Sequence, residues 1–266
     1  MIYFSCAGPA FSPARGKKGR KMKSGKVLRI LWLAAFLLTE GCLYAVILIG
    51  EACGADETAL RFISVAVACF FSAELLFFKR GLEEFLLFAA MLFTVAADVF
   101  LVLLDRHYEL AVGLFLIAQC LHALRLISGG KRKVWPSVIV RVSLGVLAVI
   151  ALAVFRFFML LTALGALYAV GILCNFVLSG TLIRRDRRFV FAFLGFFLFI
   201  LCDVTVALNG VGRGLGVSEN VIRIMPRLTW VFYLPSQVLI VISALKWPEK
   251  AEETAEPAPE ETLKEA

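Results

Sequence analysis

Eight apolar runs, separated by short polar segments, account for most of the chain. Their approximate bounds are 27–50, 58–78, 82–104, 109–127, 134–155, 157–180, 188–210 and 224–246. Each run has about the 20 residues that an α-helix needs to cross the hydrocarbon core of a bilayer. Because the connections are short, consecutive helices are expected to lie antiparallel in a compact bundle. The pattern predicts an all-α polytopic membrane protein with eight transmembrane helices.

The composition supports this class and suggests how the chain is divided. The protein is 61% hydrophobic and only 18% charged, which is far too apolar for a soluble domain. Residues 1–26 are polar and basic and are predicted to form a disordered cytoplasmic arm, and residues 247–266 an acidic disordered tail. The membrane domain then spans residues 27–246. A cleavable signal peptide is the alternative for the first run, but that run is about twice as long as the apolar core of a signal peptide.

The basic residues between the runs indicate the orientation. With eight spans and the N-terminus inside, the inner segments hold 21 Lys and Arg residues and the outer segments hold six, while Arg141 lies inside the fifth run. Cytoplasmic segments of membrane proteins carry such an excess, so both termini are expected to be cytoplasmic. The net charge of +8 therefore reflects topology, and no nucleic-acid partner is expected.

Two aspartates lie inside apolar runs. Asp98 falls in the run 82–104 and Asp203 in the run 188–210. A carboxylate within the bilayer costs a few kcal/mol, so it usually has a partner and a function. Under the predicted topology both runs cross in the same direction, and both aspartates lie about 10 Å below the outer edge. They could therefore face each other across a cavity.

The two halves of the chain share part of this arrangement. Phe88 precedes Asp98 by ten residues, and Phe193 precedes Asp203 by ten. The fourth and eighth runs each contain the pattern Leu-x-x-Gln-x-Leu. These matches suggest a parallel repeat of four plus four helices, related by an axis along the membrane normal. Chance also produces short matches in apolar sequence, so both explanations stay open.

Further polar side chains fall on shared helix faces and could line the same cavity. The pairs are Gln119 with His122, Tyr168 with Asn175, and Tyr233 with Gln237. The structural alternative is that such groups only hydrogen-bond between membrane helices, at about 0.6 kcal/mol each. Glu40, in the first run, could join the cavity or pair with Arg141. The seven cysteines form no CxxC pair and the two histidines lack neighbouring ligands, so neither a metal nor another cofactor is expected.

Three stretches resemble motifs of the YhhN/lysoplasmalogenase family, and the resemblance covers about residues 30–245. The stretches are Phe93-Thr-Val-Ala-Ala-Asp98-Val-Phe-Leu followed by Gly113-Leu-Phe115 and Gln119, then Leu198-Phe-Ile-Leu-Cys-Asp203-Val-Thr-Val-Ala-Leu-Asn209, and Tyr233-Leu-Pro-Ser-Gln237-Val-Leu-Ile240. Four positions depart from the family pattern. They are Ala97 in place of Gly, Gln119 in place of His, His122 in place of Tyr and Cys202 in place of Ser.

The resemblance implies a membrane-embedded hydrolase that cleaves the vinyl ether bond of lysoplasmalogens or a related lysolipid. One aspartate would deliver a proton to the vinyl carbon, and the other would stabilise the resulting cation and activate water. Asp98 and Asp203 are then the catalytic pair. The candidate substrate-binding residues are Glu40, Gln119, His122, Tyr168, Asn175, Asn209, Tyr233 and Gln237. The expected partner is a membrane lipid, with no protein partner implied and the oligomeric state left open.

The main alternative to a hydrolase is a proton-coupled transporter or a lipid-binding membrane protein. Paired intramembrane acids also serve proton-coupled transport. The sequence shows no pair of Gly/Pro-interrupted helices at corresponding places of the two halves, which is the pattern typical of transporters with broken helices. This difference favours the hydrolase.

Overall fold

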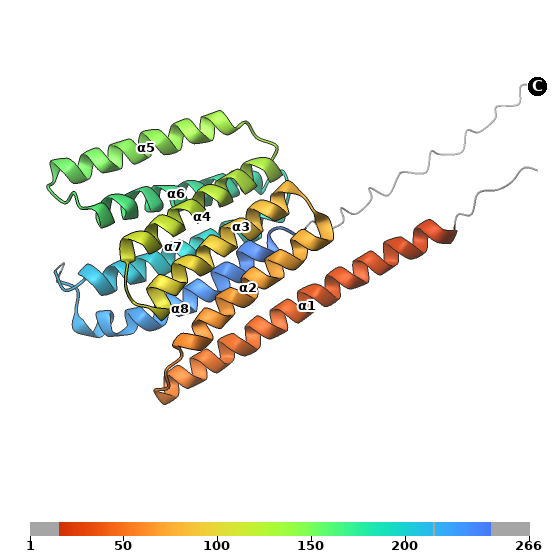
Figure 1. Ribbon diagram of the computed structural model, residues 1–266, viewed down its shortest axis with the longest axis horizontal. Helices are drawn as coiled ribbons and strands as arrows, with labels where there is room; N and C mark the ends of the chain where they lie inside the picture. The colour runs from red at the N-terminus through yellow and green to blue at the C-terminus, as the bar shows by residue number, and fades with distance from the viewer. Residues whose placement is uncertain (1–15, 215, 246–266) are drawn as a thin grey trace, which may run out of the picture.

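The computed structural model describes residues 16–214 and 216–245, and this part of the chain is helical without strands (Figure 1). The helices are α1 Gly16–Cys53, α2 Thr58–Lys79, α3 Leu82–Asp98, α4 Tyr108–Gly129, α5 Val134–Val154, α6 Leu160–Leu182, α7 Phe189–Val211 and α8 Glu219–Ile242. A π-helical turn, η1 Val99–Leu103, continues α3. Among the described residues, eight helices are long and apolar enough to cross a membrane, as the sequence predicted.

Two helices differ in their bounds from the apolar runs. The first helix begins at Gly16, so part of the segment 1–26, predicted to be disordered, is helical. The remainder of that segment and the tail 247–266 lie outside the described residues. The last helix covers 219–242 rather than 224–246, because its polar first turns are fixed by tertiary packing: Ile222 is only 3% exposed. Hydropathy therefore located the membrane-crossing part but not the helix ends.

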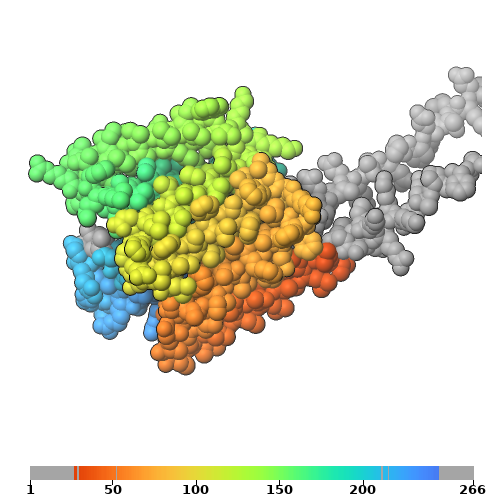
Figure 2. Space-filling view, viewed as in Figure 1, coloured from red at the N-terminus to blue at the C-terminus, as the bar shows by residue number. Residues whose placement is uncertain are grey.

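Six of the helices form a closed ring. Following the ring, α2, α3, α4, α6, α7 and α8 each pack against the next, and α8 packs back against α2. Outside the ring, α1 lies against α2 and α8, and α5 lies against α6. Figure 1 shows α1 and α5 at opposite edges of the bundle, and Figure 2 shows α1 to α4 as successive bands across one face. Half of the residues in the membrane-crossing stretch of α4 are buried, compared with 6% of those in α5.

Several helix contacts of the first half recur in the second half, if α1 to α4 are matched in order with α5 to α8. The packing of α1 on α2 corresponds to that of α5 on α6, and the packing of α4 on α6 corresponds to that of α8 on α2. A parallel repeat of four plus four helices would produce this arrangement. The duplication itself stays a prediction, because the polar contacts inside the ring do not follow the same rule.

The ring has two ends, which are named here for the residues buried near them. The aspartate end carries the connections 54–57, 104–107 and 155–159, together with residues 212–214 and 216–218. The arginine end carries the connections 80–81, 130–133 and 183–188, together with residues 243–245. Under the topology predicted from the loop charges, the arginine end faces the cytoplasm. That orientation stays a prediction.

Candidate functional site

The two aspartates each bind a tyrosine inside the ring. Tyr233 of α8 donates its hydroxyl to Oδ2 of Asp98, at 2.7 Å, and Tyr168 of α6 donates to Oδ2 of Asp203, at 2.8 Å. Asp98 is 2% exposed, whereas Asp203 is partly exposed. Within the described part of the chain, neither carboxylate forms an ion pair. Both carboxylates are therefore held by neutral donors.

Aromatic rings join the two carboxylate–tyrosine pairs into one cluster. The ring of Phe199 lies between the two tyrosines, with its centroid 5.4 Å from that of Tyr233 and 6.4 Å from that of Tyr168. Phe115 contacts both Phe199 and Tyr168, at 6.1 and 5.9 Å. The structure thus brings the predicted pair, from α3 and α7, into one aromatic surrounding.

Asp98 stands where α3 changes into a π-helical turn. The amide of Leu104 donates to the carbonyl of Val99, five residues earlier, at 3.0 Å. A π-turn inserts one extra residue into a helix, and such turns occur frequently at functional sites. The carboxylate therefore lies at an irregularity of the backbone. The apolar sequence Val99–Leu103 carries no signal that would have predicted it.

Two glycines allow the close helix packing around the cluster. A Cβ on Gly195 of α7 would lie 2.8 Å from Cγ1 of Ile240 and 3.1 Å from the carbonyl oxygen of Ser236, both on α8. A Cβ on Gly171 of α6 would lie 3.2 Å from Cβ of Gln119 on α4. Side chains at either position would push α7 from α8, or α6 from α4. The glycines therefore help to hold the polar side chains of neighbouring helices within hydrogen-bond distance.

A second polar layer lies toward the arginine end, where Asn175 is about two helical turns along α6 from Tyr168. Asn175 of α6 donates to Oε1 of Gln119, at 2.8 Å, and to its backbone carbonyl, at 2.9 Å. Arg141 of α5 reaches in from outside the ring and donates to Oδ1 of Asn175, at 2.9 Å, and to the carbonyl of Gly171, at 3.0 Å. Arg141 therefore pairs with an amide and a backbone carbonyl. The suggested pairing with Glu40 is wrong, because α1 and α5 lie on opposite sides of the ring.

The third and fourth layers cross the interior of the ring. His122 of α4 lies against the ring of Phe196 of α7, with centroids 5.6 Å apart. Arg125, one turn further along α4, donates to the carbonyl of Ile240 at 3.0 Å and to the hydroxyl of Ser243. Gln237 of α8 lies one turn below Tyr233 and donates to the hydroxyl of Ser236 at 3.2 Å. A polar column thus runs from the aspartates to the arginine end.

The arginine end itself holds a buried network of opposite charges. Arg188 donates to both carboxylate oxygens of Glu83, with Nη2 3.1 Å from Oε2, and its Nε lies 2.6 Å from Oδ2 of Asp186. Lys79 pairs with Glu84 at 3.4 Å and donates to a backbone carbonyl at the end of α8. Burial opposes the charge of Arg188, but its hydrogen bonds to the two carboxylates raise its pKa above the usual value.

Sequence reasoning missed this network. Arg125 and Arg188 were counted among the loop charges, yet they are 0% and 2% exposed. Glu83 and Glu84 begin the third helix, next to basic residues at the end of the second, and this was the available signal. Which arginine meets which glutamate depends on the ring, because Arg188 comes from the other half of the chain.

Two candidate substrate residues lie apart from the aspartate cluster. Glu40 of α1 is buried and accepts a hydrogen bond from Ser64 of α2 at 2.5 Å, outside the ring. Asn209 is exposed near the end of α7, beyond Asp203. No hydrogen bond or ring contact among the described residues connects either of them to Asp98 or Asp203.

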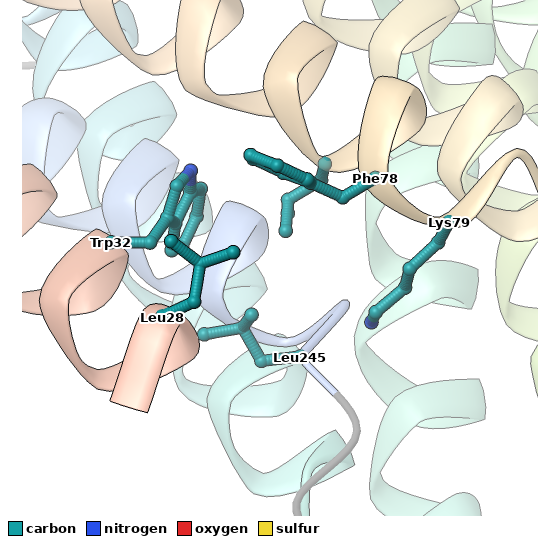
Figure 3. A pocket seen from close by; sticks show the side chains of 6 residues that line it. Leu28, Trp32, Phe78, Lys79 and Leu245 are labelled. Carbon is teal, nitrogen blue, oxygen red and sulfur yellow. The ribbon is translucent and has the colours of Figure 1, made fainter. Parts of the chain in front are cut away.

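A cavity of about 180 Å³ lies at the arginine end, away from the aspartates (Figure 3). Its lining is apolar except for one amine, and consists of Leu28, Trp32, Leu75, Phe78, Lys79 and Leu245. These residues come from α1, α2 and the segment after α8. Among the described residues, no group of three His, Cys, Asp or Glu side chains could hold a metal ion.

The fold and this site define a class: a polytopic α-helical membrane protein with two aspartates buried among aromatic rings. A family model described as the YhhN family matches residues 57–244, from just before α2 to the end of α8. The chain belongs to the YhhN family. Comparisons with curated proteins and with solved structures found no match.

Proposed function

We propose that this protein hydrolyses the vinyl ether bond of lysoplasmalogens or a closely related lysolipid. Membership of the YhhN family suggests a lysoplasmalogenase-like membrane protein. The observation that carries the proposal is the pair of carboxylates in one aromatic cluster, each held by a phenol and neither paired with a cation among the described residues. Two such carboxylates can divide the roles of acid and base, as in glycoside hydrolysis, where they lie roughly 5–9.5 Å apart.

The burial of the two carboxylates supports a division of their roles. An ionised carboxylate is far more costly to bury than a neutral one. Asp98, at 2% exposure, is therefore the protonated acid, and the partly exposed Asp203 is the ionised base. Tyr233 and Tyr168 each occupy one carboxylate oxygen, so Oδ1 of each aspartate is left for the reaction. The tyrosines then act on the carboxylates rather than on the substrate.

The proposed reaction proceeds through an oxocarbenium-like cation. Asp98 gives its proton to the vinyl carbon that is not bonded to oxygen. The vinyl carbon that is bonded to oxygen then becomes cationic. Asp203 stabilises this cation and removes a proton from the water that attacks it. The resulting hemiacetal breaks its carbon–oxygen bond, its hydroxyl proton moves to the glycerol oxygen, and a fatty aldehyde leaves. The proton on Asp203 then returns to Asp98 within the cluster, so the water is the only molecule consumed besides the lipid.

The test is release of aldehyde from a panel of lysoplasmalogens by the protein purified in detergent. We expect cleavage by the wild type and a loss of about 10²–10⁴-fold with Asp203→Asn. Glu74→Gln is the matched control, because Glu74 is a carboxylate within α2 that accepts one hydrogen bond from Trp32, which an amide oxygen can also accept. Its turnover should equal that of the wild type. Near-wild-type turnover by Asp203→Asn would remove the chemistry on which the proposal rests.

A proton-coupled transporter is the second candidate, and the polar column favours it. The column runs from the aspartates to the arginine end, as a transport path would. However, the buried ion pairs Arg188–Glu83 and Lys79–Glu84 lie at that end, and a lysolipid leaving there would have to separate them. Counterflow of labelled lysolipid in liposomes without aldehyde release would support the transporter and contradict the hydrolase.

A further inference from the structure

Four buried side chains of the polar column have polar atoms without a hydrogen-bond partner among the described residues. The atoms are Nε2 of Gln119, both ring nitrogens of His122, Nε of Arg125 and Oε1 of Gln237. All four residues are at most 1% exposed. Three of them lie on α4 at intervals of three residues, and the fourth lies on α8, whose Ile240 carbonyl accepts a hydrogen bond from Arg125. An unpartnered buried polar atom costs about 1–3 kcal/mol, so a group of them in one place indicates a bound ligand.

The chemistry and spacing of these atoms fit water. They include donors (Gln119 Nε2 and Arg125 Nε), an acceptor (Gln237 Oε1) and one of each kind on a neutral histidine. Only a ligand that both donates and accepts can serve all of them. Successive residues of the row rise by about 4.5 Å along α4, and a single water molecule bridges such a gap with hydrogen bonds of about 2.8 Å. Buried waters typically make about three hydrogen bonds of this kind.

We propose that Gln119, His122, Arg125 and Gln237 hold a file of bound water molecules that leads from the arginine end to Asp98. This proposal rests on the proposed hydrolase function, for which the file supplies the water that is consumed. The exposed side of Asp203 is where a lipid chain can enter the cluster, and a bound chain excludes water from that side. Water must then arrive from the buried side, where the row lies.

Arg125 makes the file selective for water over cations and protons. Its guanidinium is completely buried, lies at the inner end of the row, and forms no ion pair of 4.0 Å or less with a described carboxylate. A fixed positive charge with free N–H donors admits neutral water and repels cations and protons, as arginine does in water channels. The hydrolase could thus take water through the membrane domain without making the membrane permeable to protons.

The test is hydroxyl-radical footprinting by X-ray radiolysis, which marks side chains beside bound water. Met91 is the reporter, because it is fully buried on the same face of α3 as Asp98 and lies two turns closer to the arginine end, at about the depth of His122. We expect Met91 to be oxidised as readily as an exposed methionine. Phe36, fully buried against the rings of Trp32 and Phe71, is the dry reference and should remain unmodified. An unmodified Met91 would overturn the water file.

His122→Leu sharpens the test because His122 forms no hydrogen bond to any described residue. If the row is hydrated, this variant should lose most of the Met91 oxidation and should lower kcat with KM unchanged. If the row is dry, the variant breaks no hydrogen bond and keeps an apolar side chain against Phe196, and neither quantity should change. Ser179→Ala is the matched control, because Ser179 is a fully buried polar residue whose hydroxyl donates to the carbonyl of Phe176. It should leave both quantities at the wild-type level.

The footprinting distinguishes failure of the water file from failure of the proposed function. If the wild type cleaves no vinyl ether, the hydrolase is contradicted, but oxidation of Met91 still supports the file. If the wild type cleaves and Met91 stays unmodified, the file is wrong while the hydrolase stands. Oxidation of Met91 that survives in His122→Leu, with unchanged kcat, would contradict the role of this row in supplying water.

Discussion

The two ends of the ring bury carboxylates in opposite ways. At the aspartate end, Asp98 and Asp203 accept hydrogen bonds from neutral phenols and have no cationic partner among the described residues. At the arginine end, Glu83 and Glu84 are paired with Arg188 and Lys79. Both kinds of carboxylate lie within helices that are apolar enough to cross a membrane. The difference is the charge of the partner.

That difference separates structural from reactive carboxylates. A carboxylate paired with a buried guanidinium is stabilised in its ionised form, and moving a proton onto it would leave the guanidinium uncompensated. A carboxylate held by a phenol has a hydrogen bond but no counter-charge, so it can exist with or without its proton. We therefore expect substitutions at the aspartate end to affect turnover and substitutions at the arginine end to affect stability.

The largest effect should come from the two aspartates. Asp98→Asn and Asp203→Asn should each lower turnover by about 10²–10⁴-fold, because an amide cannot exchange the catalytic proton. The double variant should be little worse than either single variant, as for residues that act as one unit. Thermal unfolding of all three should resemble that of the wild type, since the amide is isosteric. Additive losses in the double variant would show that the two carboxylates act independently.

Arg188→Met should destabilise the arginine end without any direct change at the aspartates. Removing one member of a buried ion pair leaves the other charge uncompensated, and typically lowers the free energy of unfolding by about 3–5 kcal/mol. The measurement is thermal unfolding in detergent, and adding Glu83→Gln should recover part of the loss. Arg213→Met is the matched control, because the Arg213–Glu219 pair is 72% and 65% exposed. Equal melting temperatures for Arg188→Met and the control would remove the structural role of the network.

The phenols should matter to different degrees. Tyr233→Phe removes the hydrogen bond of the fully buried Asp98, and Tyr168→Phe that of the partly exposed Asp203. A hydrogen bond to a charged group is worth about 1.5–3 kcal/mol, and Asp98 becomes charged as it gives up its proton, so turnover should fall by roughly 10–100-fold in Tyr233→Phe. The fall in Tyr168→Phe should be smaller, because water can replace the phenol at a partly exposed carboxylate. Tyr44→Phe, whose hydroxyl is 3.4 Å from a backbone carbonyl, is the control. A larger effect in Tyr168→Phe would reverse the assignment of acid and base.

The smallest effects should come from two glycines on α4. A Cβ on Gly129 would lie 2.9 Å from Oε1 of Glu83 and 3.0 Å from Nη2 of Arg188, whereas a Cβ on Gly113 would meet no atom within 4 Å. Gly129→Ala should therefore lower the free energy of unfolding by about 1–3 kcal/mol, as overpacking does. Gly113→Ala should raise it slightly, because alanine is the better helix former. Equal stability of the two variants would mean that the charge network yields to an extra methyl group.

Much of the fold could be predicted because hydropathy is a property of each residue. A run of apolar side chains crosses the bilayer whatever its neighbours are, so the eight spans agree closely with the helices. The helix ends were less predictable, as α1 and α8 show. Residues such as Ile222 become buried through contacts with other helices, and polar first turns give no hydropathy signal. The π-turn after Asp98 was not predictable, since its sequence is as apolar as a regular helix.

The sequence alone determined which residues are costly within a membrane. Asp98, Asp203, Gln119, His122 and Arg141 stand out in apolar runs, because burying a polar group without a partner is unfavourable in any fold. The choice of partner was decided only by the tertiary structure. Tyr233 donates a hydrogen bond to Asp98, and Arg141 donates to Asn175 rather than pairing with Glu40. Arg125 and Arg188, which the sequence placed in loops, are buried in the interior. These pairings join residues up to 135 positions apart, and they depend on the order of helices around the ring, which no local pattern encodes.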